Sequence, residues 1–369
     1  MKKIKVLTVF GTRPEAIKMA PLVKELESRD EIKSIVCVTA QHREMLDQVL
    51  DTFKITPDYD LNIMKSGQTL IDITSRVLES MDKVIKECNP DIVLVHGDTS
   101  TTLAGSLAAF YNRVPVGHVE AGLRTYDKYS PFPEEFNRQA TGIIADMHFA
   151  PTEVAKANLL REGKKEEDIF VTGNTAIDAL KTTVNEEYEN EMFDKFDDDN
   201  KVILLTAHRR ENLGEPMRSM FRGIKKIVNE FEDLQVIYPV HLNPLVREAV
   251  GEVLGQHERI HLIDPLEVVD FHNFLNKSHI IMTDSGGIQE EAPSLGKPVL
   301  VLRDTTERPE GVKAGTLKLV GTDEEDIYNF TKELLTDEEE YLRMSKASNP
   351  YGDGNASKYI VDAIIKRYK

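Results

Sequence analysis

Residues 281–292 are IMTDSGGIQEEA, an apolar strand pattern that meets a Ser-Gly-Gly turn and passes at once into a helical pattern. Such a turn directs backbone N–H groups and the positive end of a helix towards one point, where a phosphate can bind. Gly286 and Gly287 let an anion approach the backbone without obstruction by a Cβ atom. The same residues also suit an ordinary strand–helix turn with a glycine hinge, so this segment alone leaves both interpretations open.

Apolar runs that alternate with helical patterns lie on both sides of this turn. They occupy 4–10, 35–39, 92–95, 114–119 and 148–150 in the first half of the chain, and 202–206, 236–239, 260–263, 279–283, 299–302 and 317–320 in the second. Short, nearly continuous apolar strands are typical of parallel sheets that are buried on both faces. We therefore expect an α/β protein with two Rossmann-like, doubly wound domains that face each other across a cleft.

An acidic stretch interrupts the alternation. Residues 185–200 carry eight acidic side chains and one lysine, which predicts a solvated connector. We place the N-terminal domain at 1–175 and the C-terminal domain at 176–354. The last helical pattern, 358–368, suits either domain.

Composition excludes several classes of partner. A net charge of −17 disfavours a nucleic acid or an anionic membrane surface, and no apolar run approaches the length of a membrane span. Cys37 and Cys88 lie in apolar contexts without CxxC spacing. Buried, reduced thiols predict a cytoplasmic protein.

Common cofactor and metal motifs are absent from the sequence. It contains neither the G-x-G-x-x-G fingerprint nor the G-x-x-x-x-G-K-[ST] loop, and its histidines show no HExxH spacing. The acidic triplets at 58–60 and 197–199 are interpreted as solvated charges. We expect no cofactor and no metal.

Ionisable residues follow several of the predicted strands. Asp98 comes after 92–95, where it is either a helix N-cap or a catalytic group. Glu120 comes directly after 114–119, and a carboxylate there is costly unless it is functional or paired, for which Arg124 is available.

Three further segments show the same arrangement. The first strand is followed by Arg13 and Lys18, and 202–206 is followed by His208, Arg209 and Arg210, a cluster that suits an anionic ligand and proton transfer. The loop 131–133 precedes two adjacent acids, Glu134 and Glu135, which either are presented rigidly by the prolines or simply begin a helix.

Taken together, these segments resemble the non-hydrolysing UDP-N-acetylglucosamine 2-epimerases. The resemblance rests on GTRPEAIKMAPL (11–22), TAQHREMLDQVL (39–50), HGDTSTTLAGSLAAF (96–110), GHVEAGLRT (117–125), SPFPEEFNRQATG (130–142), TAHRREN (206–212) and TDSGGIQEEAPSLGKPVLVLRDTTERPEG (283–311). These motifs span essentially the whole chain.

The resemblance implies a glycosyltransferase-B type fold, a homodimer, and interconversion of UDP-GlcNAc and UDP-ManNAc for surface polysaccharides. It implies that helix 355–369 returns to the N-terminal domain, which carries the catalytic carboxylates, while the C-terminal domain binds UDP. Its catalytic groups fall on Asp98, Glu120, Glu134 and His208, and its UDP-binding groups on Arg13, Lys18, Phe271, Ser285, Gly286, Gly287, Glu291 and Arg308. A second substrate pocket of some members maps to Gln41, Glu134, Arg209 and His241, but Glu44 and Gly67 depart from that pattern.

The chemistry suits these residue types. No carbonyl acidifies the C2 proton of the sugar, so we expect elimination of UDP to 2-acetamidoglucal, followed by re-addition. This route needs cations for the diphosphate and proton-transfer groups on both faces of the ring. A UDP-sugar glycosyltransferase, a hydrolysing epimerase that releases ManNAc and UDP, and a catalytically silent nucleotide-sugar sensor stay open as alternatives.

Overall fold

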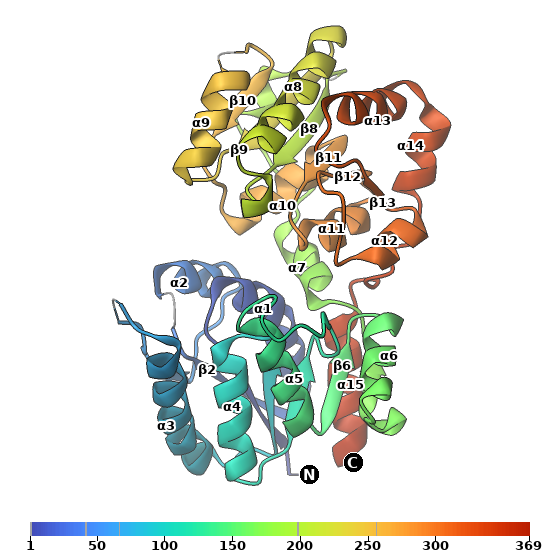
Figure 1. The fold of residues 1–369 in the computed structure, drawn as a ribbon. Helices are drawn as coiled ribbons and strands as arrows, with labels where there is room; N and C mark the ends of the chain where they lie inside the picture. Colours follow the sequence, from blue (N-terminus) through green and yellow to red (C-terminus); the bar gives the residue numbers. More distant parts are fainter. Residues whose placement is uncertain (1, 41–42, 66, 198, 256) are drawn as a thin grey trace. The chain divides into compact units, whose positions relative to one another are not determined.

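The computed structural model describes residues 2–40, 43–65, 67–197, 199–255 and 257–369, which form two compact units (Figure 1). The N-terminal unit comprises Met1–Thr182 and Tyr351–Lys369, and the C-terminal unit comprises Thr183–Pro350. The units therefore divide at 182/183 and 350/351, whereas the boundaries taken from the sequence lie at 175/176 and 354/355.

A parallel sheet with strand order β3-β2-β1-β4-β5-β6-β7 forms the centre of the N-terminal unit. Its strands are β1 (Ile4–Phe10), β2 (Ile32–Val38), β3 (Tyr59–Asp60), β4 (Ile92–His96), β5 (Val116–Val119), β6 (Met147–Ala150) and β7 (Ile169–Val171). The strand order reverses between β1 and β4, which is where doubly wound folds bind ligands. The short edge strands β3 and β7 are absent from the sequence-based prediction.

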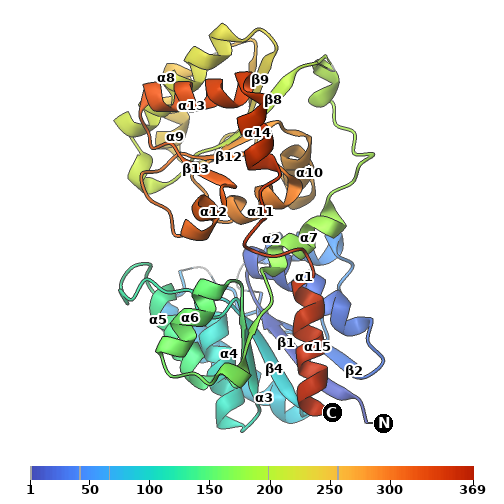
Figure 2. The same cartoon turned by 90° about the vertical axis from the view of Figure 1, so that its right-hand side faces the viewer.

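Helices cover both faces of this sheet. They are α1 (Arg13–Glu27), α2 (Arg43–Thr52), α3 (Leu70–Cys88), α4 (Ser100–Tyr111), α5 (Glu134–Ile144), α6 (Glu153–Arg161), the 3-10 turn η1 (Glu166–Asp168), α7 (Thr175–Thr183), which ends at the unit boundary, and α15 (Ala356–Tyr368). The C-terminal helix α15 packs beside α1 and buries Ile360, Val361 and Ile364 in the same core (Figure 2).

The C-terminal unit repeats the plan with the parallel order β10-β9-β8-β11-β12-β13. Its strands are β8 (Lys201–Thr206), β9 (Leu234–Pro239), β10 (Ile260–Ile263), β11 (Ile280–Thr283), β12 (Val299–Val301) and β13 (Leu317–Leu319). Its helices are η2 (Phe193–Lys195), η3 (Arg210–Asn212), α8 (Glu215–Glu230), α9 (Pro244–Val253), α10 (Val268–Lys277), α11 (Ile288–Glu291), η4 (Ala292–Leu295), α12 (Pro309–Ala314), α13 (Glu324–Thr336) and α14 (Glu338–Ser345). Two Rossmann-like units confirm the predicted fold class.

The acidic connector is more than a solvated linker. Its aromatic residues pack against the core of the C-terminal unit, with the ring centroids of Phe193 and Phe274 4.8 Å apart. The Tyr188 hydroxyl donates to Asp270 at 2.6 Å. The prediction of a purely solvated segment is therefore wrong for the described residues, because apolar side chains are interspersed among the acids.

The predicted functional residues sit mainly at the carboxyl ends of the central strands. Gly11, Gly97 and Glu120 follow β1, β4 and β5, and the turns after β8 and β11 begin at Ala207 and Asp284. In parallel α/β sheets this is the edge at which ligands bind. Within the described part of the chain, none of the helices has both the length and the apolar character that crossing a membrane requires.

Candidate functional site

Asp98 lies in the turn between β4 and α4, and it is not the cap of that helix. The cap is Thr99, whose hydroxyl accepts a hydrogen bond from the backbone N–H of Thr102 at 3.1 Å. The carboxylate of Asp98, 30% exposed, instead lies 3.0 Å from Nη2 of Arg138. The interpretation of Asp98 as the helix N-cap is therefore wrong.

The surroundings of Asp98 bring the pKa of its carboxyl group closer to neutral pH. Burial raises the pKa of Asp98 to about 6, the charge on Arg138 opposes this rise, and the charge on Glu120 adds to it. A carboxyl with that pKa exists in both protonation states under ordinary conditions. This property suits a group that must both give and take protons.

Glu120 directly follows β5 in a left-handed backbone conformation, with φ of +61°. For a residue other than glycine this conformation costs roughly 1–3 kcal/mol, and such strain is concentrated at functional sites. Nζ of Lys18 donates to its two carboxylate oxygens at 2.9 and 2.7 Å, and Nε2 of His96 lies 2.8 Å from Oε2. Arg124, the partner offered by the sequence, pairs with Glu162 at 2.7 Å instead.

These partners keep Glu120 ionised. Burial alone would raise the pKa of Glu120, but the charges on Lys18 and His96 outweigh it and hold the pKa well below its usual value. Asp98 and Glu120 thus follow neighbouring strands with their proton affinities moved in opposite directions. Pairs of carboxylates separated in this way commonly divide acid and base roles.

Two buried side chains, Glu15 and His118, form hydrogen bonds with the turns that follow β1 and β4. Glu15 accepts hydrogen bonds from the backbone of Gly11 and Thr12 and from the hydroxyl of Thr99, at 3.0, 2.8 and 2.7 Å, so it links the first turns of α1 and α4. Nε2 of His118 lies 2.7 Å from the carbonyl oxygen of Gly97. Burial lowers the pKa of His118 to about 3, so the ring is neutral and donates through Nε2.

Helix α5 adds the third candidate carboxylate and two contacts to Asp98. Glu134 is the first residue of the helix. One turn later, Nδ2 of Asn137 donates to the backbone carbonyl of Asp98 at 2.9 Å, next to the Arg138–Asp98 ion pair. The N-terminal unit therefore brings the Asp98 turn and the start of α5 together.

In the C-terminal unit, the buried residue Asp284 joins two strand ends. Its Oδ2 accepts hydrogen bonds from the backbone N–H groups of His208 and Arg209, both at 2.8 Å. Nε of Arg209 in turn donates to the backbone carbonyl of Asp284 at 2.9 Å. The turn after β8 is thereby fixed against the Ser285-Gly286-Gly287 turn after β11.

Two guanidinium groups lie over Gly286. A Cβ atom at this position would be 3.8 Å from Nη2 of Arg209 and 3.8 Å from Nη2 of Arg308. Arg303 is held by Glu307 at 2.6 Å and by Glu211 at 3.2 Å. The turn thus has two forked cations beside it, and such groups can form paired hydrogen bonds with carboxylates or phosphates.

The helix after this turn is shorter than the sequence pattern indicates. Helix α11 spans only Ile288–Glu291 and continues as the 3-10 turn Ala292–Leu295. The backbone N–H of Ser285 is already used, because it donates to Oγ1 of Thr283 at 2.9 Å. So short a helix has only a weak dipole, and the expectation of a longer helix after this turn is therefore wrong.

Carboxylates pair with both of the arginines beside the turn. Nε of Arg308 donates to Glu290, and Nη1 of Arg209 lies 3.2 Å from Glu307. Although Glu307 is half-buried, its hydrogen bonds with Arg303 lower its pKa to about 2. The guanidinium groups beside the turn are therefore paired with carboxylates of the same unit.

Comparison with known proteins identifies the family. The profile described as UDP-N-acetylglucosamine 2-epimerase matches residues 24–365. The chain is 70% identical over 368 residues to the UDP-N-acetylglucosamine 2-epimerase of Bacillus subtilis, with 100% of this chain and 97% of the relative covered. The chain belongs to the UDP-N-acetylglucosamine 2-epimerase family.

Solved structures of UDP-N-acetylglucosamine 2-epimerases share the fold. A putative member from Listeria monocytogenes superposes with a TM-score of 0.95 at 60% identity, covering 99% of this chain and 97% of that chain. The enzyme from Neisseria meningitidis, solved with UDP-GlcNAc bound, superposes with a TM-score of 0.88 at 53% identity, covering 98% and 100%. The two Rossmann-like units are thus those of the glycosyltransferase-B-like fold of these epimerases.

The remaining residues implied by the epimerase resemblance divide between the two units. Arg13 is the first residue of α1, in the N-terminal unit. In the C-terminal unit, Oε1 of Glu291 would lie 3.8 Å from a Cβ atom on Gly287, and Phe271 is half-buried on α10, one residue before His272.

The residues that the resemblance implies for a second pocket belong to different units. Glu134 belongs to the N-terminal unit, and Arg209 and His241 belong to the C-terminal unit, where the rings of His208 and His241 lie 5.2 Å apart. Burial lowers the pKa of His241, and the neighbouring His208 lowers it further. Gln41 lies outside the described residues.

Three residues that contact the candidate residues are not predicted as functional from the sequence. They are His96, Asp284 and Arg138, which contact candidate residues or hold their turns. His96 directly follows the predicted strand 92–95, and Arg138 lies one helical turn after Glu134, so the positions of both residues gave a weak signal. Their partners are distant in sequence, which only the fold reveals.

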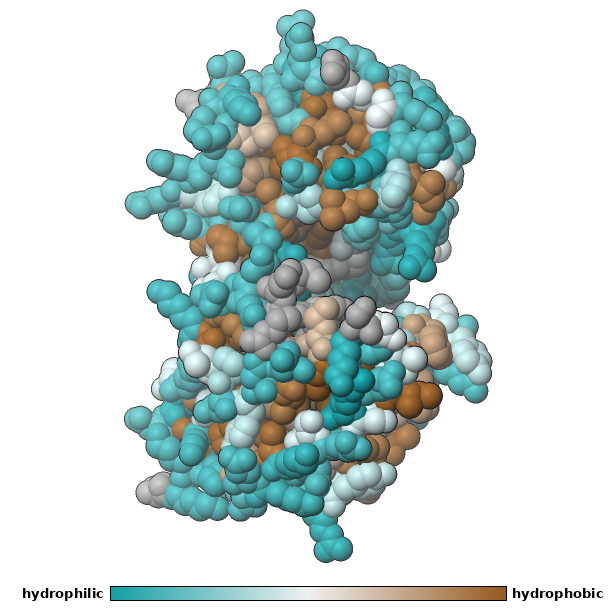
Figure 3. Space-filling view, turned by 90° about the vertical axis from the view of Figure 1, so that its left-hand side faces the viewer, coloured by the Kyte–Doolittle hydropathy of each residue, from teal (hydrophilic) through white to brown (hydrophobic). Residues whose placement is uncertain are grey.

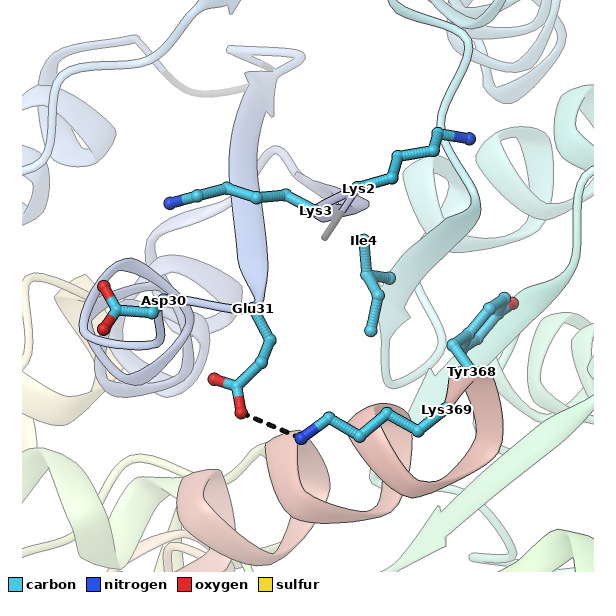
Figure 4. Close-up of a pocket in the computed structure, with 7 residues that line it drawn as sticks. All are labelled: Lys2, Lys3, Ile4, Asp30, Glu31, Tyr368 and Lys369. Atoms are coloured by element: carbon cyan, nitrogen blue, oxygen red, sulfur yellow. Dashed lines mark hydrogen bonds and ion pairs between the residues drawn. The ribbon is translucent and has the colours of Figure 1, made fainter.

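Other features of the chain lie away from these residues. A cavity of about 520 Å³ is lined by Lys2, Lys3, Ile4, Asp30, Glu31, Tyr368 and Lys369 (Figure 4). It lies where β1 begins, at the sheet edge opposite to the one where parallel α/β folds bind ligands. Among the described residues, no three His, Cys, Asp or Glu side chains come together as metal ligands would.

Proposed function

We propose that this protein interconverts UDP-GlcNAc and UDP-ManNAc by reversible elimination and re-addition of UDP. The observation that carries this proposal is the pair of carboxylates after the neighbouring strands β4 and β5. Asp98 lies 3.0 Å from Arg138, and Glu120 lies 2.7 Å from Lys18 and 2.8 Å from His96, and burial raises the pKa of Asp98 while Lys18 and His96 lower the pKa of Glu120. Relatives that are named UDP-N-acetylglucosamine 2-epimerases and match the whole chain support it.

The reaction is balanced without any added reagent. A base removes the proton from C2 while the bond between C1 and the diphosphate oxygen breaks, so that UDP leaves with the bonding pair and a double bond forms between C1 and C2. UDP then adds back to C1, and an acid delivers a proton to the opposite face of C2. The product differs from the substrate only in configuration at C2.

We assign the proton transfers to Asp98, Glu120 and Glu134. Asp98 suits either direction of transfer because both of its protonation states are populated near neutral pH. Glu120 is ionised and so can accept a proton, although its lowered pKa makes it a weaker base than Asp98. The Ser285-Gly286-Gly287 turn with Arg209 and Arg308 would stabilise the departing diphosphate, with His208 beside them. Arg13, Lys18, Phe271 and Glu291 complete the proposed binding residues.

One incubation separates the candidate functions. UDP-GlcNAc alone is incubated with the protein in D2O and followed by NMR. We expect UDP-ManNAc, deuterium at C2 of both nucleotide sugars, and little free UDP. Accumulation of ManNAc and UDP would instead identify a hydrolysing epimerase, and the absence of exchange would indicate a glycosyltransferase that lacks its acceptor or a silent sensor.

We also propose that the protein is a homodimer. Phe110 and Tyr111 on α4 and Ile143 on α5, here called the α4–α5 patch, are 58%, 66% and 77% exposed. The two helices are neighbours, and Phe110 and Ile144 line one hollow. On the face drawn in Figure 3, hydrophobic residues are exposed among the hydrophilic residues of the N-terminal unit. Exposed aromatic and branched side chains on two neighbouring helices favour contact with a second copy.

The Ile143→Glu variant tests this assembly. A charge at the centre of an apolar interface must be desolvated without a partner, so we expect the variant to sediment as a monomer at a concentration at which the natural protein is a dimer. The control is Val154→Glu, which changes another exposed apolar residue of the same unit. Analytical ultracentrifugation gives the masses, and an unchanged dimer in the Ile143→Glu variant would exclude the patch as the interface.

The two thiols support a cytoplasmic location. Cys37 and Cys88 are not joined by a disulfide, and burial raises the pKa of both. Unpaired, unreactive thiols are the usual state of cysteine in a reducing compartment. We therefore propose that the enzyme acts in the cytoplasm.

A further inference from the structure

Helix α5 contacts the Asp98 turn through two of its side chains. Nδ2 of Asn137 donates to the backbone carbonyl of Asp98 at 2.9 Å, and Nη2 of Arg138 lies 3.0 Å from the carboxylate oxygen Oδ2. The Arg138 side chain is itself largely buried, with 12% exposed. One contact fixes the backbone of Asp98 and the other fixes its carboxylate.

A second buried carboxylate orients Arg138 from the other side. Oε2 of Glu135, which is fully buried, lies 3.5 Å from Nε of Arg138. Glu135 also accepts the backbone N–H groups of Thr125 and Tyr126, both at 3.0 Å. These residues belong to the loop that follows Glu120, so the contacts of Glu135 link that loop to Arg138.

We propose that Arg138 is a positioning residue that fixes the Asp98 carboxylate in its working orientation and adjusts its acidity through their ion pair. This inference rests on the proposed function, because it assigns Arg138 a role in the proton transfers at C2. Arg138 acts through Asp98 and is not assigned a contact with the substrate.

The charges around Asp98 show why Arg138 has this effect. The groups that face Asp98 are Arg138 on α5, Glu120 after β5, Lys18 on α1 and His96 at the end of β4. Lys18 and His96 both contact Glu120, at 2.7 and 2.8 Å, whereas Arg138 contacts Asp98 itself. Burial has the largest effect on the pKa of Asp98 and raises it. The charge on Arg138 has the second-largest effect and lowers this pKa.

The sign of the effect follows directly. Without the cation, the ionised form of Asp98 loses its nearest stabilising charge, so the pKa of Asp98 rises further. If Asp98 acts as a base, the acidic limb of the kcat/KM profile moves to higher pH. If it acts as an acid, the basic limb does so. A purely structural role for Arg138 would lower activity without moving either limb.

The test is the pH dependence of kcat/KM for UDP-GlcNAc in Arg138→Gln and Arg138→Lys. For Arg138→Gln we expect one limb to move up by about one pH unit, the lower end of the effect of an opposite charge within hydrogen-bonding distance. For Arg138→Lys we expect that limb to stay near its natural position, while kcat falls because a lysine lacks the planar fork. If the glutamine variant does not fold, Arg138→Met replaces it, because methionine is similar in length to glutamine and also lacks the charge.

Arg29→Gln is the matched control. Arg29 also pairs with carboxylates, Glu25 and Asp362, on the same unit, and its replacement should leave both limbs unmoved. Identical limbs in the natural enzyme, Arg138→Gln and Arg138→Lys would overturn the inference. Failure of the proposed function is a separate result, namely no C2 exchange by the natural enzyme.

Discussion

The Asp98→Asn variant is expected to lower kcat for epimerisation by about 10²- to 10⁴-fold, the usual contribution of a positioned general acid or base. An amide cannot exchange a proton at C2, yet it keeps the shape and an oxygen acceptor for Arg138, which lies 3.0 Å away. We therefore expect the fold and the Kd for UDP to change little. NMR rates of UDP-ManNAc formation and calorimetric titration with UDP measure the two quantities separately.

Asp51→Asn is the control for this prediction. Asp51 is an exposed residue of α2 in the same unit, so the same chemical change there should leave turnover intact. If Asp98→Asn turned over UDP-GlcNAc at a rate within a few fold of the natural enzyme, Asp98 would have no part in the proton transfers. If both kcat and UDP affinity fell together, Asp98 would be supporting binding rather than catalysis.

The Gly286→Ala variant is expected to weaken UDP binding by about 10- to 100-fold, which corresponds to loss of about 1.5–3 kcal/mol from charge-assisted hydrogen bonds. The added methyl group lies 3.8 Å from the guanidinium nitrogens of Arg209 and Arg308, an ordinary contact distance, so the ligand-free fold accommodates it. A phosphate oxygen that must approach the backbone between these groups does not have that space. Calorimetric titration with UDP measures the effect.

A second glycine provides the matched control. Gly251 lies in α9, where an added Cβ meets nothing within 4 Å, so Gly251→Ala should leave UDP binding unchanged. Thermal unfolding should show that neither variant is destabilised, because an alanine at a compatible position restricts the unfolded chain. Unaltered affinity for UDP in Gly286→Ala would remove the turn from the diphosphate site.

Local patterns predict most of this fold because its central strands are buried on both faces. Val202 to Thr206 and Ile4 to Phe10 are short, mostly apolar runs, which are typical of strands buried on both faces. The edge strands Tyr59–Asp60 and Ile169–Val171 have two and three residues, too few to show a pattern. The connector at 185–200 is misjudged for a related reason, since a count of charges ignores the aromatic residues between them.

The sequence predicts where the candidate carboxylates lie, but it does not predict their pKa values. Asp98 and Glu120 were found because each follows a predicted strand. The pKa of Asp98 is raised by burial against the charge on Arg138, whereas the charges on Lys18 and His96 outweigh burial and lower the pKa of Glu120. Such pairings are tertiary contacts between residues far apart in the chain, and local periodicity carries no information about them.

Positional isotope exchange tests the central claim, that the bond between C1 and the diphosphate oxygen breaks and re-forms. UDP-GlcNAc carrying ¹⁸O in the bridge between C1 and the β-phosphorus is incubated with the enzyme, and the ³¹P signals are followed. We predict that the label moves into non-bridging positions of the β-phosphate, because the oxygens of departed UDP become equivalent before it adds back. Formation of UDP-ManNAc with the label still wholly in the bridge would contradict the account.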